Sequence, residues 1–391
     1  MHVVGVPVWE GAKKGLSKKV SRIIMGDGLD SLTAGMKKAF VVTDSFMAQS
    51  GKVSYVTDKL NRAGVEWQVF SDIAGEPDIG MVTAGTEKIT EFKPDTVICL
   101  GGGAAIDAAK AIVFIARKTG AVENHVGFIA IPTTSGTGSE VSRFAVITDK
   151  TNGIKYPLID DSLLPDVAVL DAQLVMSAPP SVTADTGIDV FTHAVEAFVS
   201  TGRNDFSDAC AEKAIKLVNH YLMAAYKNPN DAKARQGMHN ASCLAGVAFS
   251  NAGLGLNHGM AHAMGAKFHI PHGRANGILL PYVMSFNAGC VDQLTPTAKR
   301  YAQISRLLRL DTSSVRQSAL NMIRTARTFI KKMNMPCTIE AAGVTKEQFE
   351  AELDEMAAAA LADRCTATNP RPVTVEDIKE IYRKAFMGKI P

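Results

Sequence analysis

Histidines are crowded into one short stretch of this chain. Four of the nine fall within the fifteen residues from His258 to His272. His258 and His262 are four positions apart, so on a helix both would project from one face, one turn apart. His272 follows a proline, which predicts a loop that returns a third imidazole to the same place. His269 is predicted to be a packing or surface residue instead.

An acidic residue with the same helical spacing lies upstream, where Asp189 precedes His193 by four positions. A carboxylate and several imidazoles on two helices can enclose one divalent ion. Such ligands suit iron(II), zinc or manganese, whereas calcium prefers oxygen ligands. Without cysteine, the set can leave a coordination position open for substrate, as catalytic sites do. Any single histidine could equally be a structural residue, and spacing alone does not say which ones bind.

Two glycine-rich turns follow predicted strands in the first half of the chain. Gly101, Gly102 and Gly103 lead from a strand into a helix, where free backbone N–H groups attract anions and the missing side chains let a pyrophosphate approach. The second turn, residues 132–140, adds hydroxyl donors from threonine and serine. Each turn alone could be ordinary, but the pair predicts two walls of a nucleotide cleft at the carboxyl ends of strands.

Asp44 ends an earlier predicted strand. A carboxylate there can accept hydrogen bonds from ribose hydroxyls and would repel a 2′-phosphate, so NAD is predicted rather than NADP. In the usual dinucleotide fingerprint the acid follows the glycines, and here it precedes them. The alternative is a solvated aspartate at a strand end.

The elements that must hold these residues change character near Pro179-Pro180. Before it, short apolar runs alternate with helical sequence, which predicts a parallel sheet covered on both faces by helices. The predicted strands are residues 39–43, 66–70, 95–100, 126–131 and 167–170, with a hairpin of 144–148 and 154–156 around Asn152-Gly153. After it, helices are predicted at residues 181–200, 205–225, 231–250, 256–266, 295–309, 313–333 and 346–362. We therefore expect an α/β dinucleotide-binding domain over 1–178 and an all-helical metal-binding, catalytic domain over 179–391.

The overall composition is that of a soluble globular protein, with 46% hydrophobic and 21% charged residues in 391. A formal charge of +3 argues against nucleic acid as a partner. Six cysteines without CxxC pairing favour reduced thiols in the cytoplasm, and neither a secretory signal nor a membrane span is predicted. The lysine-rich residues 1–19 are predicted to form a solvated arm, with a docking extension as the alternative.

Several motifs together resemble the iron-dependent (group III) alcohol dehydrogenases over nearly the whole chain. They are GGGAAIDAAK from Gly101, IPTTSGTGSEV from Ile131, TGIDVFTHAVEA from Thr186, GLNHGMAH with PHGRAN from Gly255, and Asn369-Pro370-Arg371. The resemblance implies an N-terminal dinucleotide-binding α/β domain and a C-terminal helical domain, with metal and nicotinamide in the cleft between them. It assigns the metal to Asp189, His193, His258 and His272. His262 then lies beside the nicotinamide as the candidate catalytic residue.

The resemblance also implies the residues that contact cofactor and substrate. The cofactor is assigned to Asp44, Gly101, Gly102, Gly103, Asp107, Thr133, Thr134, Thr137, Ser142 and Lys155. The substrate is assigned to Phe144, Phe249, Leu254 and Cys365, for which plain core packing is the alternative. Ala104 stands where the family usually has serine, and Phe144 is expected to narrow the pocket toward short, unbranched alcohols.

These features predict an NAD-dependent, iron-containing enzyme that interconverts short-chain primary alcohols and aldehydes, for example 1-propanol and propionaldehyde or ethanol and acetaldehyde. Zinc is the alternative ion. The sequence looks closest to propanol and ethanol dehydrogenases of propanediol or ethanolamine breakdown, which implies a homodimer or larger homo-oligomer and a possible microcompartment. Three other functions are considered: a glycerol-dehydrogenase-like or dehydroquinate-synthase-like enzyme, a metal-dependent hydrolase, and a non-catalytic scaffold.

Overall fold

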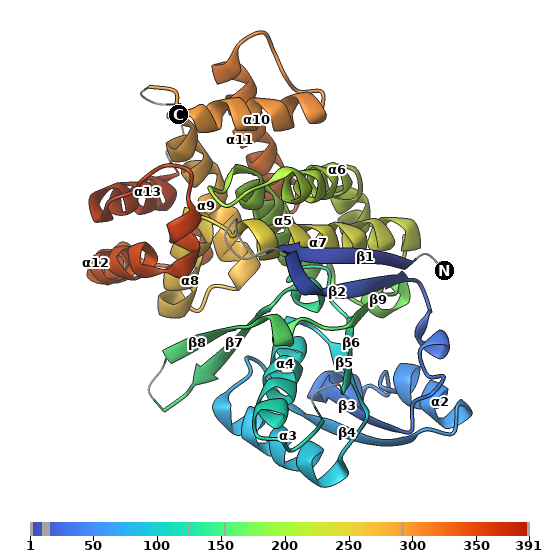
Figure 1. The fold of residues 1–391 in the computed structure, drawn as a ribbon. Coiled ribbons are helices and arrows are strands. Elements are labelled where there is room, and N and C mark those ends of the chain that lie inside the picture. The colour runs from blue at the N-terminus through green and yellow to red at the C-terminus, as the bar shows by residue number, and fades with distance from the viewer. Residues whose placement is uncertain (1–2, 10–15, 124–125, 152–153, 291–292, 389–391) are drawn as a thin grey trace. The chain divides into compact units, whose positions relative to one another are not determined.

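The computed structural model describes residues 3–9, 16–123, 126–151, 154–290 and 293–388. The chain divides into two units, residues 1–176 and 177–391, which differ in secondary structure. The first combines a sheet with helices, and the second is helical throughout its described residues (Figure 1). The predicted fold class, an α/β region followed by an all-helical one, is confirmed.

The first unit is organised around a seven-stranded sheet in the order β1-β2-β9-β6-β5-β3-β4. Its strands are β1 Val3–Trp9, β2 Leu16–Met25, β3 Lys38–Asp44, β4 Glu66–Ile73, β5 Thr96–Gly101, β6 Gly127–Pro132 and β9 Val167–Leu170. All neighbouring pairs are parallel except β1 with β2. The carboxyl ends of β3, β5 and β6 are therefore adjacent, which is where the two glycine-rich turns begin.

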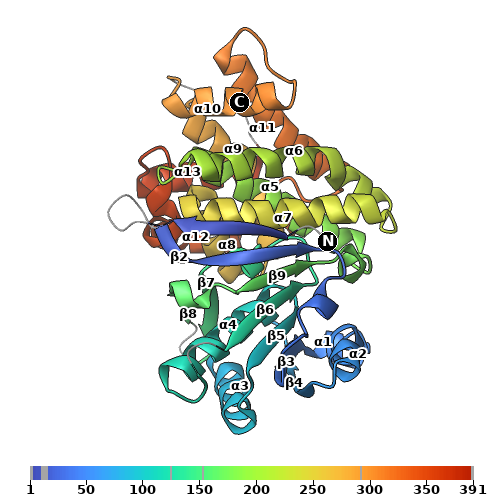
Figure 2. The ribbon, with the colours of Figure 1, turned by 45° about the vertical axis from the view of Figure 1, so that its right-hand side comes forward.

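Both faces of the central strands are buried, because alternate residues of β3, β5 and β6 enter different cores. Val97 and Cys99 of β5 pack in the core that includes α3 (Ile79–Phe92) and α4 (Gly103–Lys118). Ile98 and Leu100 pack in the core that includes α1 (Ser45–Gln49) and α2 (Ser54–Arg62). Figure 2 shows these two helix pairs on opposite sides of β3 and β5. Burial of both faces explains why these strands read as continuous apolar runs.

The predicted hairpin is confirmed as β7 (Phe144–Asp149) paired antiparallel with β8 (Ile154–Ile159). Its Asn152-Gly153 turn lies outside the described residues. Short 3-10 helices complete this unit: η1 Leu29–Ser31, η2 Ser139–Val141, η3 Asp161–Leu163 and η4 Ala172–Val175.

The prediction of a solvated arm at the N-terminus is wrong for the described part of it. β1 pairs antiparallel with β2, and β2 pairs in parallel with β9, so this segment extends the sheet. The lysines at 13, 14, 18 and 19 obscured the apolar runs on either side of them, VVGVPVW before and VSRIIM after.

The second unit contains nine helices in its described residues. They are α5 Pro180–Val199, α6 Asp205–Lys227, α7 Ala232–Ala252, α8 Leu256–Phe268, α9 His272–Ala288, α10 Pro296–Leu307, α11 Val315–Lys332, α12 Lys346–Ala362 and α13 Val375–Met387, with short 3-10 segments η5 Glu340–Ala342 and η6 Arg364–Thr368. A large apolar core joins α8, α9, α12 and α13. Among the described residues, the search for a helix both long and apolar enough to cross a bilayer finds none.

Two of these helices were not predicted. The loop expected at His272 is instead the first turn of α9, which begins at that residue. Because α9 is buried on nearly all sides and contains Pro281, it shows no amphipathic stripe. α13 carries a readable signal, since Thr374 and Asp377 form a capping box at its start.

Glycine lets α9 approach α5 closely. A Cβ at Gly273 would collide with the backbone of Asp185, and one at Gly277 would lie 3.3 Å from the Ile188 side chain. Asp185 and Ile188 precede Asp189 on α5, so this close packing sets the first turn of α9, with His272, against the acidic turn of α5.

Candidate metal centre and nucleotide turn

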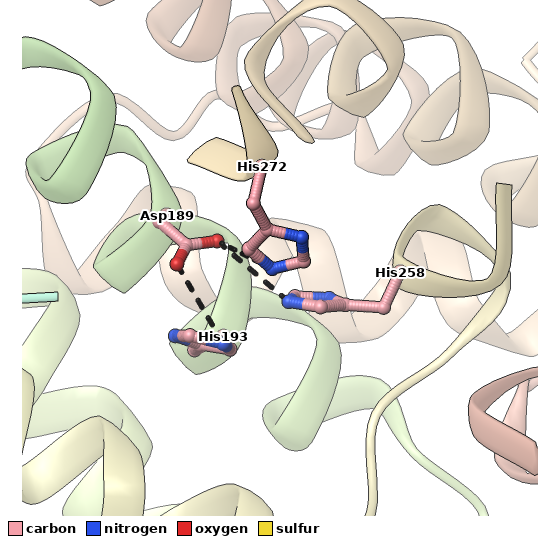
Figure 3. A group of neighbouring side chains, drawn as sticks. All are labelled: Asp189, His193, His258 and His272. Atoms are coloured by element: carbon pink, nitrogen blue, oxygen red, sulfur yellow. Dashed lines mark ion pairs between the residues drawn. The ribbon is translucent and has the colours of Figure 1, made fainter. Parts of the chain in front are cut away.

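The structure brings together the four side chains assigned to the metal. Asp189 and His193 lie one turn apart on α5, His258 lies in the first turn of α8, and His272 begins α9. Their ligand atoms all lie within 4.8 Å of one another. Figure 3 shows the three imidazoles gathered around the carboxylate. Helix register therefore supplies two of the ligands, and helix packing supplies the other two.

The spacing of the ligand atoms fits a divalent ion. Asp189 Oδ1 lies 3.5 Å from His272 Nε2 and 3.7 Å from His258 Nε2, and Asp189 Oδ2 lies 4.0 Å from His193 Nε2. A tetrahedral ion with bonds of about 2.1 Å holds its ligands roughly 3.4 Å apart. Small side-chain movements would therefore bring these atoms into a coordination shell.

Burial favours the neutral form of one of the ligands, His258. Burial, with neighbouring His193, His272 and His262, holds the pKa of His258 well below its usual value. Asp189 and His193 are also buried, whereas the side chain of His272 is 43% exposed. A neutral imidazole is the form that binds a metal, so the lowered pKa of His258 keeps that ring able to offer a lone pair.

Glu196 supports His258 from behind, and the sequence reading had missed it. Its carboxyl group is hydrogen-bonded to His258 Nδ1 and accepts the backbone N–H of Asn257 at 2.7 Å. Burial raises the pKa of Glu196 to about 8. A partner on Nδ1 fixes the ring so that Nε2 faces the other ligands. Glu196 is seven residues after Asp189, on the same face of α5, and that spacing was the signal available in the sequence.

A buried amide pair holds the carboxylate in place. Asn276 Nδ2 donates to Asp189 Oδ1 at 2.7 Å and lies 3.2 Å from His258 Nε2 and 3.1 Å from His272 Nε2. Asn257 Nδ2 donates to Asn276 Oδ1 at 2.9 Å, which turns the amide nitrogen of Asn276 toward the ligands. Asn276 thus contacts three of the four ligand side chains, and the sequence reading had not singled it out.

His262 lies beside the four ligands and outside their set. Its side chain is 43% exposed, and its ring stacks on that of His272 with centroids 5.3 Å apart. With Asp363 and Cys365 it forms a second group whose ligand atoms lie within 4.8 Å of one another. The exposed His269 directly follows α8 in a left-handed conformation.

Two of the predicted substrate residues lie near this centre. The Phe249 ring is 4.7 Å from that of His193, and Cys365 belongs to the group around His262. Leu254 accepts a hydrogen bond from Thr368 Oγ1 through its carbonyl, at 2.8 Å. Phe144 begins β7 in the first unit.

The predicted nucleotide residues of the first unit converge at adjacent strand ends. Gly101 ends β5, and Gly102 precedes α4 without a side-chain cap, which leaves backbone N–H groups free for an anion. Asp44 ends β3, and its Oδ1 caps α1 by accepting the N–H of Met47 at 2.8 Å. A Cβ at Gly101 would lie 3.1 Å from Asp44 Oδ2. The acid and the glycines are therefore neighbours despite their separation in sequence.

The second turn packs directly on the first. A Cβ at Gly103 would lie 2.9 Å from Thr137 Oγ1, and one at Gly102 would lie 3.3 Å from Thr134 Cγ2. Thr133 donates its N–H to the carbonyl of Gly101 at 3.0 Å. Threonine hydroxyls and free N–H groups thus share one small region, which suits a phosphate.

Asp107 and Ser142 have internal hydrogen bonds that fix this region. Asp107 accepts from Ser139 Oγ at 2.6 Å and from the N–H of Val146 at 3.0 Å. The buried Lys110 ammonium donates to Ser139 Oγ, Ser142 Oγ and the carbonyl of Phe144. These bonds tie the second turn and β7 to α4. Lys155 pairs with Thr148 through β8, and its side chain lies outside the described residues.

Comparison with known proteins identifies the family that the sequence motifs resemble. The family described as iron-containing alcohol dehydrogenase matches residues 21–172, and the C-terminal part of the Fe-containing alcohol dehydrogenase family matches 183–386. The chain is 43% identical to 1-propanol dehydrogenase PduQ of Citrobacter freundii over 368 residues, which cover 93% of this chain and 98% of that one. It is 39% identical to an NADPH-dependent butanol dehydrogenase of Clostridium saccharobutylicum, over 90% and 92% of the two chains.

A solved structure is also similar to this chain over nearly its whole length. Sulfoacetaldehyde reductase of Bifidobacterium kashiwanohense in complex with NAD+ matches with a TM-score of 0.80 at 28% identity, covering 93% of this chain and 96% of that one. These matches confirm the predicted enzyme class, an oxidoreductase with a metal ion and NAD(P), over the hydrolase and the scaffold. Since the two family patterns together span most of its length, this chain belongs to the iron-containing alcohol dehydrogenase family.

Proposed function

We propose that this alcohol dehydrogenase interconverts a short, unbranched primary alcohol and its aldehyde with NAD(H), at a divalent ion held by Asp189, His193, His258 and His272. Iron(II) is the proposed ion and zinc the alternative. The observation that carries the proposal is the convergence of one carboxylate and three imidazoles within 4.8 Å. 1-Propanol and 1-butanol are favoured as substrates because the two relatives compared are named as propanol and butanol dehydrogenases.

The proposed reaction divides its work between bound groups and the chain. When bound, the cation would polarise the alcohol or aldehyde oxygen, and the nicotinamide would exchange the hydride. Glu196 and Asn276 hold the ligands in register through His258 and Asp189. The stacking of His262 on His272 and its partial exposure support a role for His262 in relaying the alcohol proton. The Phe249 ring against His193 gives this centre an apolar side, which suits an alkyl substrate.

NAD is proposed over NADP because of Asp44. Its Oδ2 lies against Gly101 at the strand ends, where a ribose would meet a negative charge. That charge would repel a 2′-phosphate. The NADPH-dependent relative makes this a point for measurement, since one family accommodates both cofactors.

The test begins with anaerobic purification and elemental analysis, followed by NADH oxidation with a panel of short aldehydes. We expect about one metal ion per chain and the highest kcat/KM with propionaldehyde or butyraldehyde. In the oxidative direction, a preference for glycerol over 1-propanol would overturn the substrate assignment in favour of a polyol dehydrogenase.

A matched pair of histidine variants tests the ligand set. His272→Ala should lose both metal and turnover, because it removes a ligand whose Nε2 lies 3.5 Å from Asp189 Oδ1. His269→Asn, three residues earlier, should keep both, since His269 is exposed and asparagine tolerates its left-handed backbone. Full metal content in His272→Ala would show that the ligand assignment is wrong.

A further inference from the structure

One hydrogen bond links His262 to a residue 101 positions away. His262 Nδ1 lies 2.9 Å from Asp363 Oδ2. His262 is on α8, and Asp363 directly follows α12 and caps the start of η6. The imidazole that stacks on His272 therefore has a carboxylate behind it.

The fold holds Asp363 in place independently of His262. Its Oδ1 accepts the backbone N–H of Cys365 at 2.8 Å as the N-cap of η6. Thr366 Oγ1 in the same turn donates to the carbonyl of Ala360 at 2.6 Å. α8 can approach this turn because Gly259 has no side chain, and a Cβ there would lie 3.3 Å from Asp363 Cβ. The two carboxylate oxygens thus serve different partners, one structural and one the histidine.

This arrangement decides where the imidazole proton lies. A neutral imidazole has one N–H and one lone pair, and a carboxylate only accepts. Burial opposes ionisation of Asp363, but its hydrogen bonds with His262 and with the backbone N–H of Cys365 hold its pKa below the usual value, so the carboxylate is ionised near neutral pH. Nδ1 must then carry the proton and donate it to Oδ2, which leaves the lone pair on Nε2.

We propose that Asp363 is a positioning residue that fixes His262 in the Nδ1–H tautomer and thereby makes Nε2 the atom that accepts the alcohol proton. The tautomer is a property of the chain itself. Only the use of Nε2 in catalysis rests on the proposed function. A carboxylate that orients a catalytic histidine acts in the same way in other enzymes. Replacing that carboxylate with asparagine keeps the geometry and reverses the tautomer.

The same three groups, His262, Asp363 and Cys365, could in principle bind a second soft cation. Thiolate is the form of cysteine that binds metals. Burial raises the pKa of the Cys365 thiol well above its usual value, which favours the protonated form. His262 Nδ1 and Asp363 Oδ2 are also already hydrogen-bonded to each other. The hydrogen-bonded pair therefore accounts for the cluster better than a second metal site.

The test is Asp363→Asn in the zinc-loaded, full-length enzyme, which is diamagnetic. Asparagine can keep the cap to Cys365 through Oδ1, so the turn should remain folded, while its amide now donates to His262 Nδ1. Histidine ¹³C and ¹⁵N NMR reads the tautomer directly, with His262→Gln identifying the resonances. The wild type should show Nδ1–H and Asp363→Asn should show Nε2–H. The variant's kcat should fall by about 100-fold with little change in KM.

Asp160→Asn is the matched control. Asp160 caps η3 by accepting the N–H of Ser162 at 2.8 Å and its hydroxyl at 2.6 Å, so its carboxylate binds a serine and not a histidine. It should change neither the His262 resonances nor kcat. The proposal is overturned if the wild type shows the Nε2–H tautomer, or if Asp363→Asn keeps the tautomer of the wild type.

Two further outcomes separate the proposal from the proposed function. A reversed tautomer with unchanged kcat overturns the catalytic use of Nε2. If even the wild type turned over no alcohol, the proposed function would fail, while NMR would still decide the tautomer. Cadmium added to the zinc enzyme should give no thiolate charge-transfer band. If such a band appears and Cys365→Ser removes it, the cluster is a second metal site and the hydrogen-bonded pair is overturned.

Discussion

The proposed metal centre and the proposed nucleotide turn would bind their ligands by opposite means. In the metal centre, side chains supply all the chemistry, and Asp189 with three imidazoles converges from three helices. In the nucleotide turn, the absence of side chains matters most, because Gly101, Gly102 and Gly103 expose backbone N–H groups at the start of α4. One site depends on which groups are present, and the other on which are missing.

The two sites should therefore respond differently to substitution. Removing a side chain from the metal centre should release the ion without disturbing the first unit. Adding a side chain to the glycine turn should weaken nucleotide binding without releasing the ion. Variants can therefore test whether the two sites are independent in binding, even though turnover requires both.

The largest effect on the nucleotide turn is expected from Gly103→Val. A Cβ at Gly103 would lie only 2.5 Å from Thr137 Cγ2 and 2.9 Å from Thr137 Oγ1, so the two turns must separate. At a cost of about 3 kcal/mol for overpacking, NADH affinity should fall roughly 100-fold. Fluorescence titration measures the affinity, and elemental analysis should find the metal content unchanged.

Ala104→Ser is the control for Gly103→Val, because it changes the neighbouring residue in the same turn and adds only a hydroxyl. It should leave NADH affinity equal or higher. If Gly103→Val bound NADH as tightly as the wild type, the assignment of this turn to the phosphates would be wrong.

The sequence revealed the parts of both sites that depend on local spacing. The i, i+4 pairs Asp189/His193 and His258/His262 lie on helices as predicted, and the glycines lie between the end of β5 and the start of α4. It did not reveal residues whose role depends on distant partners. Glu196 reaches His258 across 62 positions, and Asn276 reaches Asp189 across 87.

The start of α9 shows a second limit of sequence reading. His272 looked like a loop residue because a proline precedes it, and proline is also a natural residue just before a helix. The helix that follows is buried on nearly every side, so periodicity gave no sign of it. Which histidine lies outside the ligand set came from family resemblance, because spacing treats His258 and His262 alike.

A smaller effect is expected in the metal centre from Asn276→Ala. The change removes the amide that donates to Asp189 Oδ1 and leaves the buried Asn257 amide without its Oδ1 acceptor. Loss of such a supporting group costs about 10-fold in metal affinity at the lower end of its usual range. Competition with a chromophoric chelator measures this, and NADH affinity should stay at the wild-type value.

Asn287→Ala provides the comparison for Asn276→Ala. Asn287 is on the same helix and forms a buried amide pair with Asn369, with hydrogen bonds of 3.0 and 2.9 Å. It should lower thermal stability similarly while metal affinity stays unchanged. Equal metal loss in both variants would mean that Asn276 acts only through the stability of the fold.

The smallest effect is expected from Asp44→Asn, which tests the charge beside the glycines. Asparagine can keep the cap to the Met47 N–H, so α1 should remain intact, while the negative charge next to Gly101 disappears. NADH affinity should fall about 5-fold, for about 1 kcal/mol of lost hydrogen bonding to the ribose, and NADPH affinity should rise because repulsion of its 2′-phosphate is removed. Asp231→Asn, which alters a similar cap on α7 through the Ala234 N–H, should change neither. If the ratio of NADH affinity to NADPH affinity were unchanged in Asp44→Asn, other residues would determine cofactor preference and Asp44 would be a helix cap alone.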